Sequence, residues 1–230
     1  SDHAWNTVIP ATGSPSVASM TQTTAPNLKV FTGLPSGANN NGLVAPLSAL
    51  DPSAPASTRV LATSPTGGAG VAWQLTLTNN TGGALSSVDV SYDIARFTQS
   101  FDNNGGHSTQ LQPENLPGYE LWYSTNSTTW TDVSGLNPTI DGANGTVAVP
   151  NTLGVTEVSP YELTFDNAVA SGANFELRWI DSNASLPSPD QIIGLTDVNI
   201  TPVPLPAALP LLLSALGGMG LVGRRRAKNA

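Results

Sequence analysis

At 230 residues, without cysteine and with a formal net charge of −8, the chain has the length of one large domain or two small ones. The absence of cysteine excludes disulfide bridges, thiolate zinc sites, iron–sulfur clusters and a cysteine nucleophile. Four of the eight basic residues lie among the last seven positions, and all sixteen acidic residues precede them; 4 basic against 16 acidic residues give that preceding part a net charge of −12. A surface this acidic argues against nucleic acid and anionic polysaccharide as directly bound partners.

The first quarter of the chain, residues 1–57, is rich in small and polar residues and contains few apolar runs of strand length. Leu28–Phe31 is its best strand candidate, whereas Gly37–Gly42, which contains three consecutive asparagines, predicts a loop. Two interpretations remain open for this part: a low-complexity lead-in, or irregular first strands of the domain that follows.

Strict alternation of apolar and polar residues begins near residue 71. In Val71–Thr78 the odd-numbered residues are apolar and three of the even-numbered ones are polar, a period of two that is typical of a half-buried strand. Val88–Ile94 alternates in the same way, and Asn79–Gly83 between them has the composition of a turn. Two amphipathic strands joined by a turn rich in Gly and Asn predict an antiparallel pair.

Further short alternating segments follow, separated by turn residues. They are Tyr119–Ser124, Trp130–Val133, Thr146–Val149, Tyr161–Phe165, Phe175–Trp179 and Ile192–Ile200. Before the C-terminal tail, the sequence has no stretch with a sustained helical period and capping residues. We therefore expect an all-β fold, an antiparallel β-sandwich of the jelly-roll type, over residues 58–201 or, with the earlier strand candidate included, 28–201.

The last part of the chain, residues 202–230, has a different character. Val203, Pro204, Leu205, Pro206 and Ala207 open it, and Leu205–Gly223 contains nineteen residues without a charge. As a helix this run would be about 28 Å long, close to the ~30 Å hydrocarbon core of a bilayer. The basic residues that follow would hold that end on the cytoplasmic side; they are Arg224, Arg225, Arg226 and Lys228. The pattern predicts one C-terminal hydrophobic helix that anchors the chain, with the preceding domain outside the cytoplasmic membrane.

The order of these parts, a Pro-rich pentapeptide, an apolar helix and a basic tail, closely resembles the VPLPA-CTERM variant of the PEP-CTERM sorting signal. The resemblance covers residues 203–228 and implies export in a Gram-negative bacterium. It also implies recognition of Val203–Ala207 by an exosortase-type membrane enzyme and removal of the helix after a transient stage in the inner membrane. An ordinary tail anchor, in which Pro206 and Pro210 only begin a helix, is the alternative. An exported chain needs an N-terminal export signal, which we expect to have been removed or truncated before Ser1.

Three segments of the second half, Tyr119–Val133, Asn174–Asn183 and Gly194–Thr201, are similar to jelly-roll domains common in PEP-CTERM proteins. In those domains an acidic, Gly-rich loop often follows the Arg-Trp strand, and the last strand usually begins with two acidic residues. Here residues 184–191 contain Pro and Ser instead, and Asp197 is one acid where two are usual. The resemblance implies a fold rather than an activity.

Catalytic chemistry finds little support in the sequence. His3 and His107 are the only histidines, their spacing is not that of metal ligands, and no Gly-x-Ser-x-Gly turn is present. Glu120, Glu162 and Glu176 lie on expected strands, two of them near tryptophans, so a glycan hydrolase with paired carboxylates is a weak alternative. We expect no catalytic residue and no enzymatic activity.

Four residues in and around the loop after the Arg-Trp strand are candidate calcium ligands: Asp181, Asn183, Asp190 and Asp197. Their side-chain oxygens are hard ligands of the kind that calcium takes. No EF-hand spacing is present, and Asp and Asn also occur in turns because they cap the local backbone. A structural calcium ion is the only cofactor that the sequence suggests.

Trp122, Tyr123 and Trp130 are candidates for an aromatic platform that stacks on sugar rings. Trp122 shares a strand face with Glu120, the less apolar of the two faces, which suits an exposed ring. Burial in the core is the alternative for each of the three aromatic side chains.

The resemblance to exosortase substrates, which are associated with exopolysaccharide and biofilm matrix, implies a structural or adhesive protein of the cell surface or extracellular matrix. Its partners would be the exosortase-type enzyme and exopolysaccharide, and no nucleic acid is expected. The alternative is a carbohydrate-binding module that recognises matrix glycan, and the weak third hypothesis is the glycan hydrolase.

Overall fold

The structure is a computed structural model. It describes residues 53–55, 57–64, 70–97, 118–137, 154–182 and 192–203, and, as backbone only, four strands within residues 3–46. These parts of the chain contain twelve strands, one short 3₁₀ helix and no α-helix. The strands are β1 (His3–Pro10), β2 (Met20–Gln22), β3 (Lys29–Val30), β4 (Asn39–Pro46), β5 (Arg59–Ser64), β6 (Gly70–Thr78), β7 (Leu85–Arg96), β8 (Glu120–Ser124), β9 (Thr131–Asp132), β10 (Gly154–Val169), β11 (Asn174–Ser182) and β12 (Ile193–Pro202), and the 3₁₀ helix is η5 (Ser134–Leu136).

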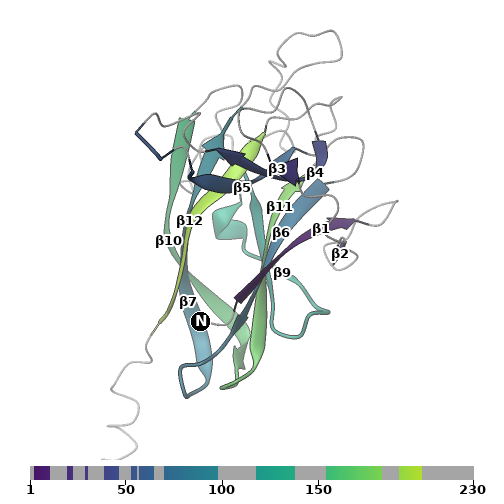
Figure 1. Ribbon diagram of the computed structural model, residues 1–230. Helices are drawn as coiled ribbons and strands as arrows, with labels where there is room; N and C mark the ends of the chain where they lie inside the picture. Colours follow the sequence, from purple (N-terminus) through teal and green to yellow (C-terminus); the bar gives the residue numbers. More distant parts are fainter. Residues whose placement is uncertain are drawn as a thin grey trace, which may run out of the picture.

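The strands form two six-stranded sheets that pack face to face (Figure 1). Sheet A has the order β2-β1-β6-β11-β8-β9, and sheet B has the order β10-β7-β12-β5-β4-β3. Pairing is antiparallel throughout sheet A, and in sheet B only the short β3–β4 contact is parallel. The prediction of an all-β chain is therefore confirmed for the described residues, and the two antiparallel sheets are consistent with a β-sandwich.

The core lies between the two sheets and is built from the apolar members of the alternating strands. Its largest side chains come in pairs that join sheet A to sheet B. The ring of Trp179 on β11 meets that of Tyr92 on β7 edge-on, with centroids 5.9 Å apart. Phe165 on β10 contacts both Tyr123 on β8 and Phe175 on β11, at 5.5 and 5.1 Å between centroids. Such edge-to-face and tilted contacts add to the stabilisation that burial of these large rings already gives.

The predicted pairing of the first two alternating strands is wrong. β6 pairs with β1 and β11 in sheet A, whereas β7 pairs with β10 and β12 in sheet B. The turn between them crosses from one sheet to the other because Asn79 is tied to the β10–β11 connection. Its side chain donates to the carbonyl of Val169, and its backbone N–H donates to the carbonyl of Ala173, at 2.8 and 2.9 Å.

The N-terminal quarter contributes strands to both sheets. The backbone of β3 falls within the predicted strand Leu28–Phe31, but the predicted loop Gly37–Gly42 is wrong from residue 39 onward, where β4 begins. Asn39 pairs with Ser64 of β5, and the register shifts between Asn39 and Leu43. Of the other predicted strands, Thr146–Val149 lies outside the described residues, and the rest coincide with β8 to β12.

Candidate functional site

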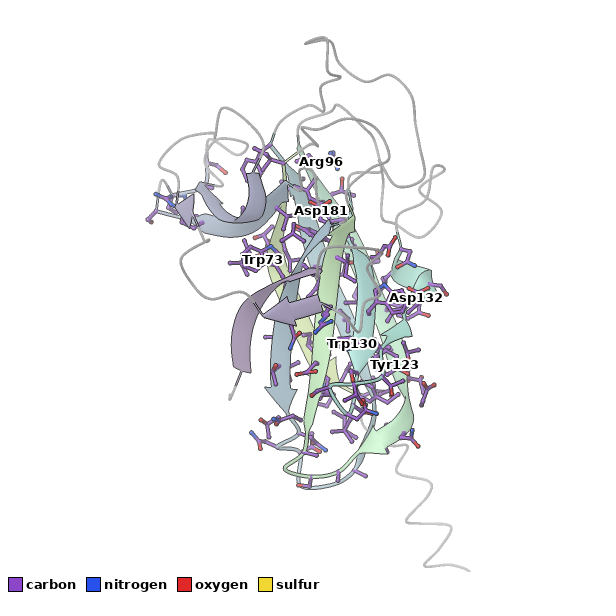
Figure 2. The ribbon with its side chains drawn as sticks, turned by 90° about the vertical axis from the view of Figure 1, so that its right-hand side faces the viewer. Trp73, Arg96, Tyr123, Trp130, Asp132 and Asp181 are labelled. Carbon is purple, nitrogen blue, oxygen red and sulfur yellow. The ribbon has the colours of Figure 1, made fainter. Side chains whose placement is uncertain are left out.

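The surface of sheet A that points away from the core carries a mixed aromatic and charged cluster. We call it the Trp122 face, and it consists of Gln74, Glu120, Trp122, Trp130, Asp132, Glu176 and Arg178. These residues come from β6, β8, β11 and the short segment that ends in β9. Figure 2 shows Trp130 and Asp132 near β8 and β9, away from the end of the sandwich where Asp181 and Arg96 lie.

The strand register brings these side chains together. Gln74 lies opposite Arg178, Arg178 opposite Trp122, and Trp122 opposite Asp132, so one row crosses four strands. Because successive side chains alternate between the faces of a strand, residues 176 and 120 share this surface with that row. The same alternation sends Leu177 and Trp179 into the core.

Arg178 is the centre of the Trp122 face. Its guanidinium carbon lies 3.8 Å from the centroid of the Trp130 ring, and its Nε donates to Gln74 Oε1 at 2.8 Å. Gln74 Nε2 in turn donates to Glu176 Oε1 at 3.1 Å. Arg178 is only 6% exposed, and burial lowers its pKa to about 10, so the guanidinium is still charged at neutral pH.

Three carboxyl groups share this face with the guanidinium of Arg178: Glu120, Asp132 and Glu176, all partly buried. Burial raises the pKa of Glu120, and the nearby charge of Asp132 acts in the same direction. Glu176 Oε2 is shielded from solvent and has no hydrogen-bond partner in the structure. The cluster thus carries more negative than positive charge, with one carboxylate oxygen left unpaired.

The three predicted platform aromatics do not lie on one surface. Trp122 packs against Ala72 and Ile180 on the outside of sheet A and remains partly exposed, and Trp130 covers Arg178 on the same side. Tyr123 is 4% exposed and belongs to the core, where its hydroxyl accepts from the backbone N–H of Asp166. The assignment of Tyr123 to a sugar platform is therefore corrected, because alternation along β8 turns it to the opposite face from Trp122.

The two described calcium candidates do not meet. Asp181 lies on the core side of β11 and is 7% exposed. Burial raises the pKa of Tyr119, and the nearby charge of Asp181 raises it further. Asp197 lies on β12 in sheet B, is exposed, and has φ of 50° where the register with β7 shifts. These two residues therefore lie on different sheets, and Asn183 and Asp190 lie outside the described residues. Within the described ranges, no group of three or more His, Asp or Glu side chains is arranged to hold a metal.

A second acidic cluster, not predicted from the sequence, lies on the outer surface of sheet B. Asp93 on β7 lies opposite Glu157 of β10 and Thr196 of β12, next to Asp197. Burial raises the pKa of Asp93, and the charges of Asp197 and Glu157 raise it further. The alternating pattern of residues 89–93 indicates that Asp93 lies on the polar face of its strand. Only the order of the strands shows that Asp93, Glu157 and Asp197 are neighbours.

The carboxylates considered for glycan hydrolysis are divided between the sheets. Glu120 and Glu176 lie on sheet A, whereas Glu162 is exposed on β10 of sheet B, opposite Asp89. His107 lies outside the described residues. The structure therefore brings two of these carboxyl groups onto the same face, and the third is not part of that site.

The predicted sorting motif begins where the described sandwich ends. β12 runs to Pro202, and the backbone N–H of Val203 still donates to the carbonyl of Ser87 on β7, at 3.1 Å. Pro204, Leu205, Pro206 and Ala207 and the basic residues beyond them lie outside the described residues. In the part of the chain that is described, no helix is long and apolar enough to cross a membrane.

A hollow of about 330 Å³ opens at the same end of the sandwich, between the β6–β7 turn and the end of β12. Its lining is apolar on the inside, with Leu85, Val88 and Phe175, and neutral and polar at Asn79 to Thr81. It contains no charged residue and none of the predicted site residues.

Comparison with known proteins found no family model that matches the sequence and no curated protein that matches it.

Proposed function

We propose that this chain is an exported structural or adhesive protein of the cell surface or extracellular matrix, delivered by the sorting signal at residues 203–228. The observation that supports the proposal most directly is the position of the motif. The last strand ends at Pro202, and Val203 is the last described residue held by a backbone hydrogen bond to the sandwich. A cut within Val203–Ala207 would remove no described strand, so the released product would be a complete sandwich.

Two further features support this proposal. The chain before the tail holds 4 basic and 16 acidic residues, a balance that keeps an exported domain soluble, while the remaining basic residues follow the apolar run. We assign the uncharged run at residues 205–223 to a membrane-spanning helix. We assign the sandwich to the jelly-roll type, in which strands from distant parts of the chain are neighbours. β11 between β6 and β8, and β12 between β7 and β5, are pairings of that kind.

Substitution within the motif tests the sorting step. Replacing Pro204 and Pro206 with Ala removes the recognition element but keeps the apolar run, so the double variant should stay uncleaved in the membrane. Pro202→Ala is the matched control, because Pro202 is an exposed proline on β12 outside the motif. Release of the double variant at the rate of Pro202→Ala would disprove recognition of the motif.

The second candidate function is binding of matrix glycan through the Trp122 face. Its specific support is that Trp122 and Trp130 lie on the same outer surface as three carboxyl groups and a guanidinium, a combination of rings and polar groups that suits sugars. Binding to immobilised exopolysaccharide that is lost in Trp122→Ala would support it. We assign no catalytic step to the cluster.

A further inference from the structure

We propose that the Trp122 face binds a neutral glycan and discriminates against glycans that carry carboxylate or sulfate groups. This inference rests on the second candidate function above and adds the chemical class of the ligand and the role of each side chain.

The first argument is charge. Glu120, Asp132 and Glu176 bring three carboxyl groups to the face, against the single guanidinium of Arg178. That guanidinium is already engaged: Trp130 covers it, and its Nε donates to Gln74. An acidic sugar would therefore meet carboxylates at close range without a cation to pair with, and like charges at such distances repel.

The second argument is hydrogen-bonding capacity. Glu176 Oε2 accepts no hydrogen bond and Trp130 Nε1 donates none, although both atoms are shielded from solvent. A carboxylate is an acceptor and an indole N–H is a donor, so the group that suits both is one that can donate and accept. A sugar hydroxyl does so, whereas an ionised carboxylate or sulfate cannot donate to Glu176. The unpaired atoms therefore match the hydroxyl groups of a sugar, and the discrimination against anionic sugars rests on the charge of the face.

The two tryptophans have different roles in this arrangement. Trp122 packs on Ala72 and Ile180 and keeps part of its ring exposed, so it is the ring on which a sugar would stack. Trp130 uses a ring face for the guanidinium of Arg178, so in addition to offering its Nε1 donor to a hydroxyl it positions the polar cluster. Loss of Trp122 should remove the contact with the ligand, whereas loss of Trp130 should disturb Arg178 and Glu176 first.

Titration of the full-length chain in a non-ionic detergent without a sugar headgroup tests the proposal. The probes are oligosaccharides of an uncharged glucan and an uncharged mannan, and oligosaccharides of a polyuronate and a sulfated glycan. We expect binding of at least one neutral probe, at least tenfold weaker binding after Trp122→Ala, and no measurable binding of either anionic probe. Trp122→Phe should retain most of the affinity, and Glu162→Gln, an exposed change on sheet B, should retain all of it.

The variant Glu176→Ala tests whether Glu176 contacts the ligand or only supports the fold. We expect it to weaken neutral-glycan binding about threefold or more while thermal unfolding of the variant remains cooperative. Three results would overturn the inference: tighter binding of the anionic probes than of the neutral probes, binding of a neutral probe that survives Trp122→Ala, or no binding of any probe. Those results would leave the sorting proposal intact, because release of the chain from cells carrying the Pro204 and Pro206 substitutions is measured without a glycan.

Discussion

Arg178 lies beneath the ring of Trp130, with 3.8 Å between its guanidinium carbon and the ring centroid, on a surface of sheet A that faces away from the core. The two residues are not on neighbouring strands: Arg178 is on β11, Trp130 immediately precedes β9, and β8 lies between them. The indole thus spans a strand to cover a cation that is only 6% exposed. This contact holds a charged group in place on an otherwise acidic face.

Removal of the indole ring should weaken that arrangement. We expect Trp130→Ala to lower the free energy of unfolding by about 1–2 kcal/mol, because a largely desolvated cation–π contact is lost and the guanidinium becomes more exposed. Urea unfolding followed by circular dichroism measures the change. Trp130→Phe, which keeps an aromatic face, is the control and should lose less. Equal stability of Trp130→Ala and the parent chain would contradict this reading of the contact.

Asn79 should be far more important for stability than its neighbour Asn80. The Asn79 side chain donates to the carbonyls of Gly83 and Val169 and accepts from the N–H of Thr81, and the residue is 2% exposed. Asn79→Ala removes these three hydrogen bonds, of which the one to the carbonyl of Val169 is buried, so we expect a loss of about 2–3 kcal/mol. Asn80→Ala, at an exposed position of the same turn, should cost less than about 0.5 kcal/mol. Comparable losses for the two variants in denaturant titrations would refute this role of Asn79.

Two glycines that look alike in the sequence should respond differently to a methyl group. A Cβ at position 194 would lie 2.8 Å from Val60 Cγ2 and 2.9 Å from Phe97 Cε2, and both side chains are buried, at 2% and 1% exposure. Gly194→Ala should therefore cost about 1–3 kcal/mol through overpacking. A Cβ at Gly135 would overlap the ring of Tyr161, but that ring is 37% exposed and can rotate away. Thermal unfolding should place Gly135→Ala closer to the parent chain, and the reverse order would count against this packing.

The acidic cluster on sheet B predicts a stabilising substitution with a defined pH dependence. The pKa of Asp93 is raised in the folded state, so its ionised form opposes folding at neutral pH, and this cost disappears as pH falls through the raised pKa. Asp93→Asn should therefore raise the melting temperature at pH 7, and its advantage over the parent chain should shrink as the solution is acidified. Melting curves between pH 7 and pH 4 provide the measurement. An advantage that grows on acidification would have the wrong sign.

The strands from β6 onward were largely predictable from the sequence, but β1, β2, β4 and β5 were not predicted, and neither were the neighbours of each strand. A period of two identifies the buried face of a strand such as β7 without saying which strand pairs with it. The wrong assignment of β6 to β7 shows the limit: the turn between them is fixed by contacts of Asn79 with Val169 and Ala173, about ninety residues away. Long-range hydrogen bonds of this kind leave no local pattern.

The candidate site was likewise predictable only in part. Alternation along β8 correctly separated Trp122 from Leu121, and it could also have placed Tyr123 in the core. The link from Gln74 through Arg178 to Trp130 could not be anticipated, because it requires β11 to lie between β6 and β8. The composition likewise shows the excess of acidic residues, but it cannot show that Asp93 lies near Asp197, because their proximity depends on the order of the strands in sheet B.

If the sandwich is sorted by a cut at its C-terminal boundary, the intact mass of the protein recovered from the cell surface and the medium will show it. We expect a species whose C-terminus falls between Val203 and Ala208, which retains β12 and its Val203–Ser87 hydrogen bond. A species that ends at Ala230 and occurs only in the membrane fraction would contradict it, and the apolar run would then be a plain tail anchor.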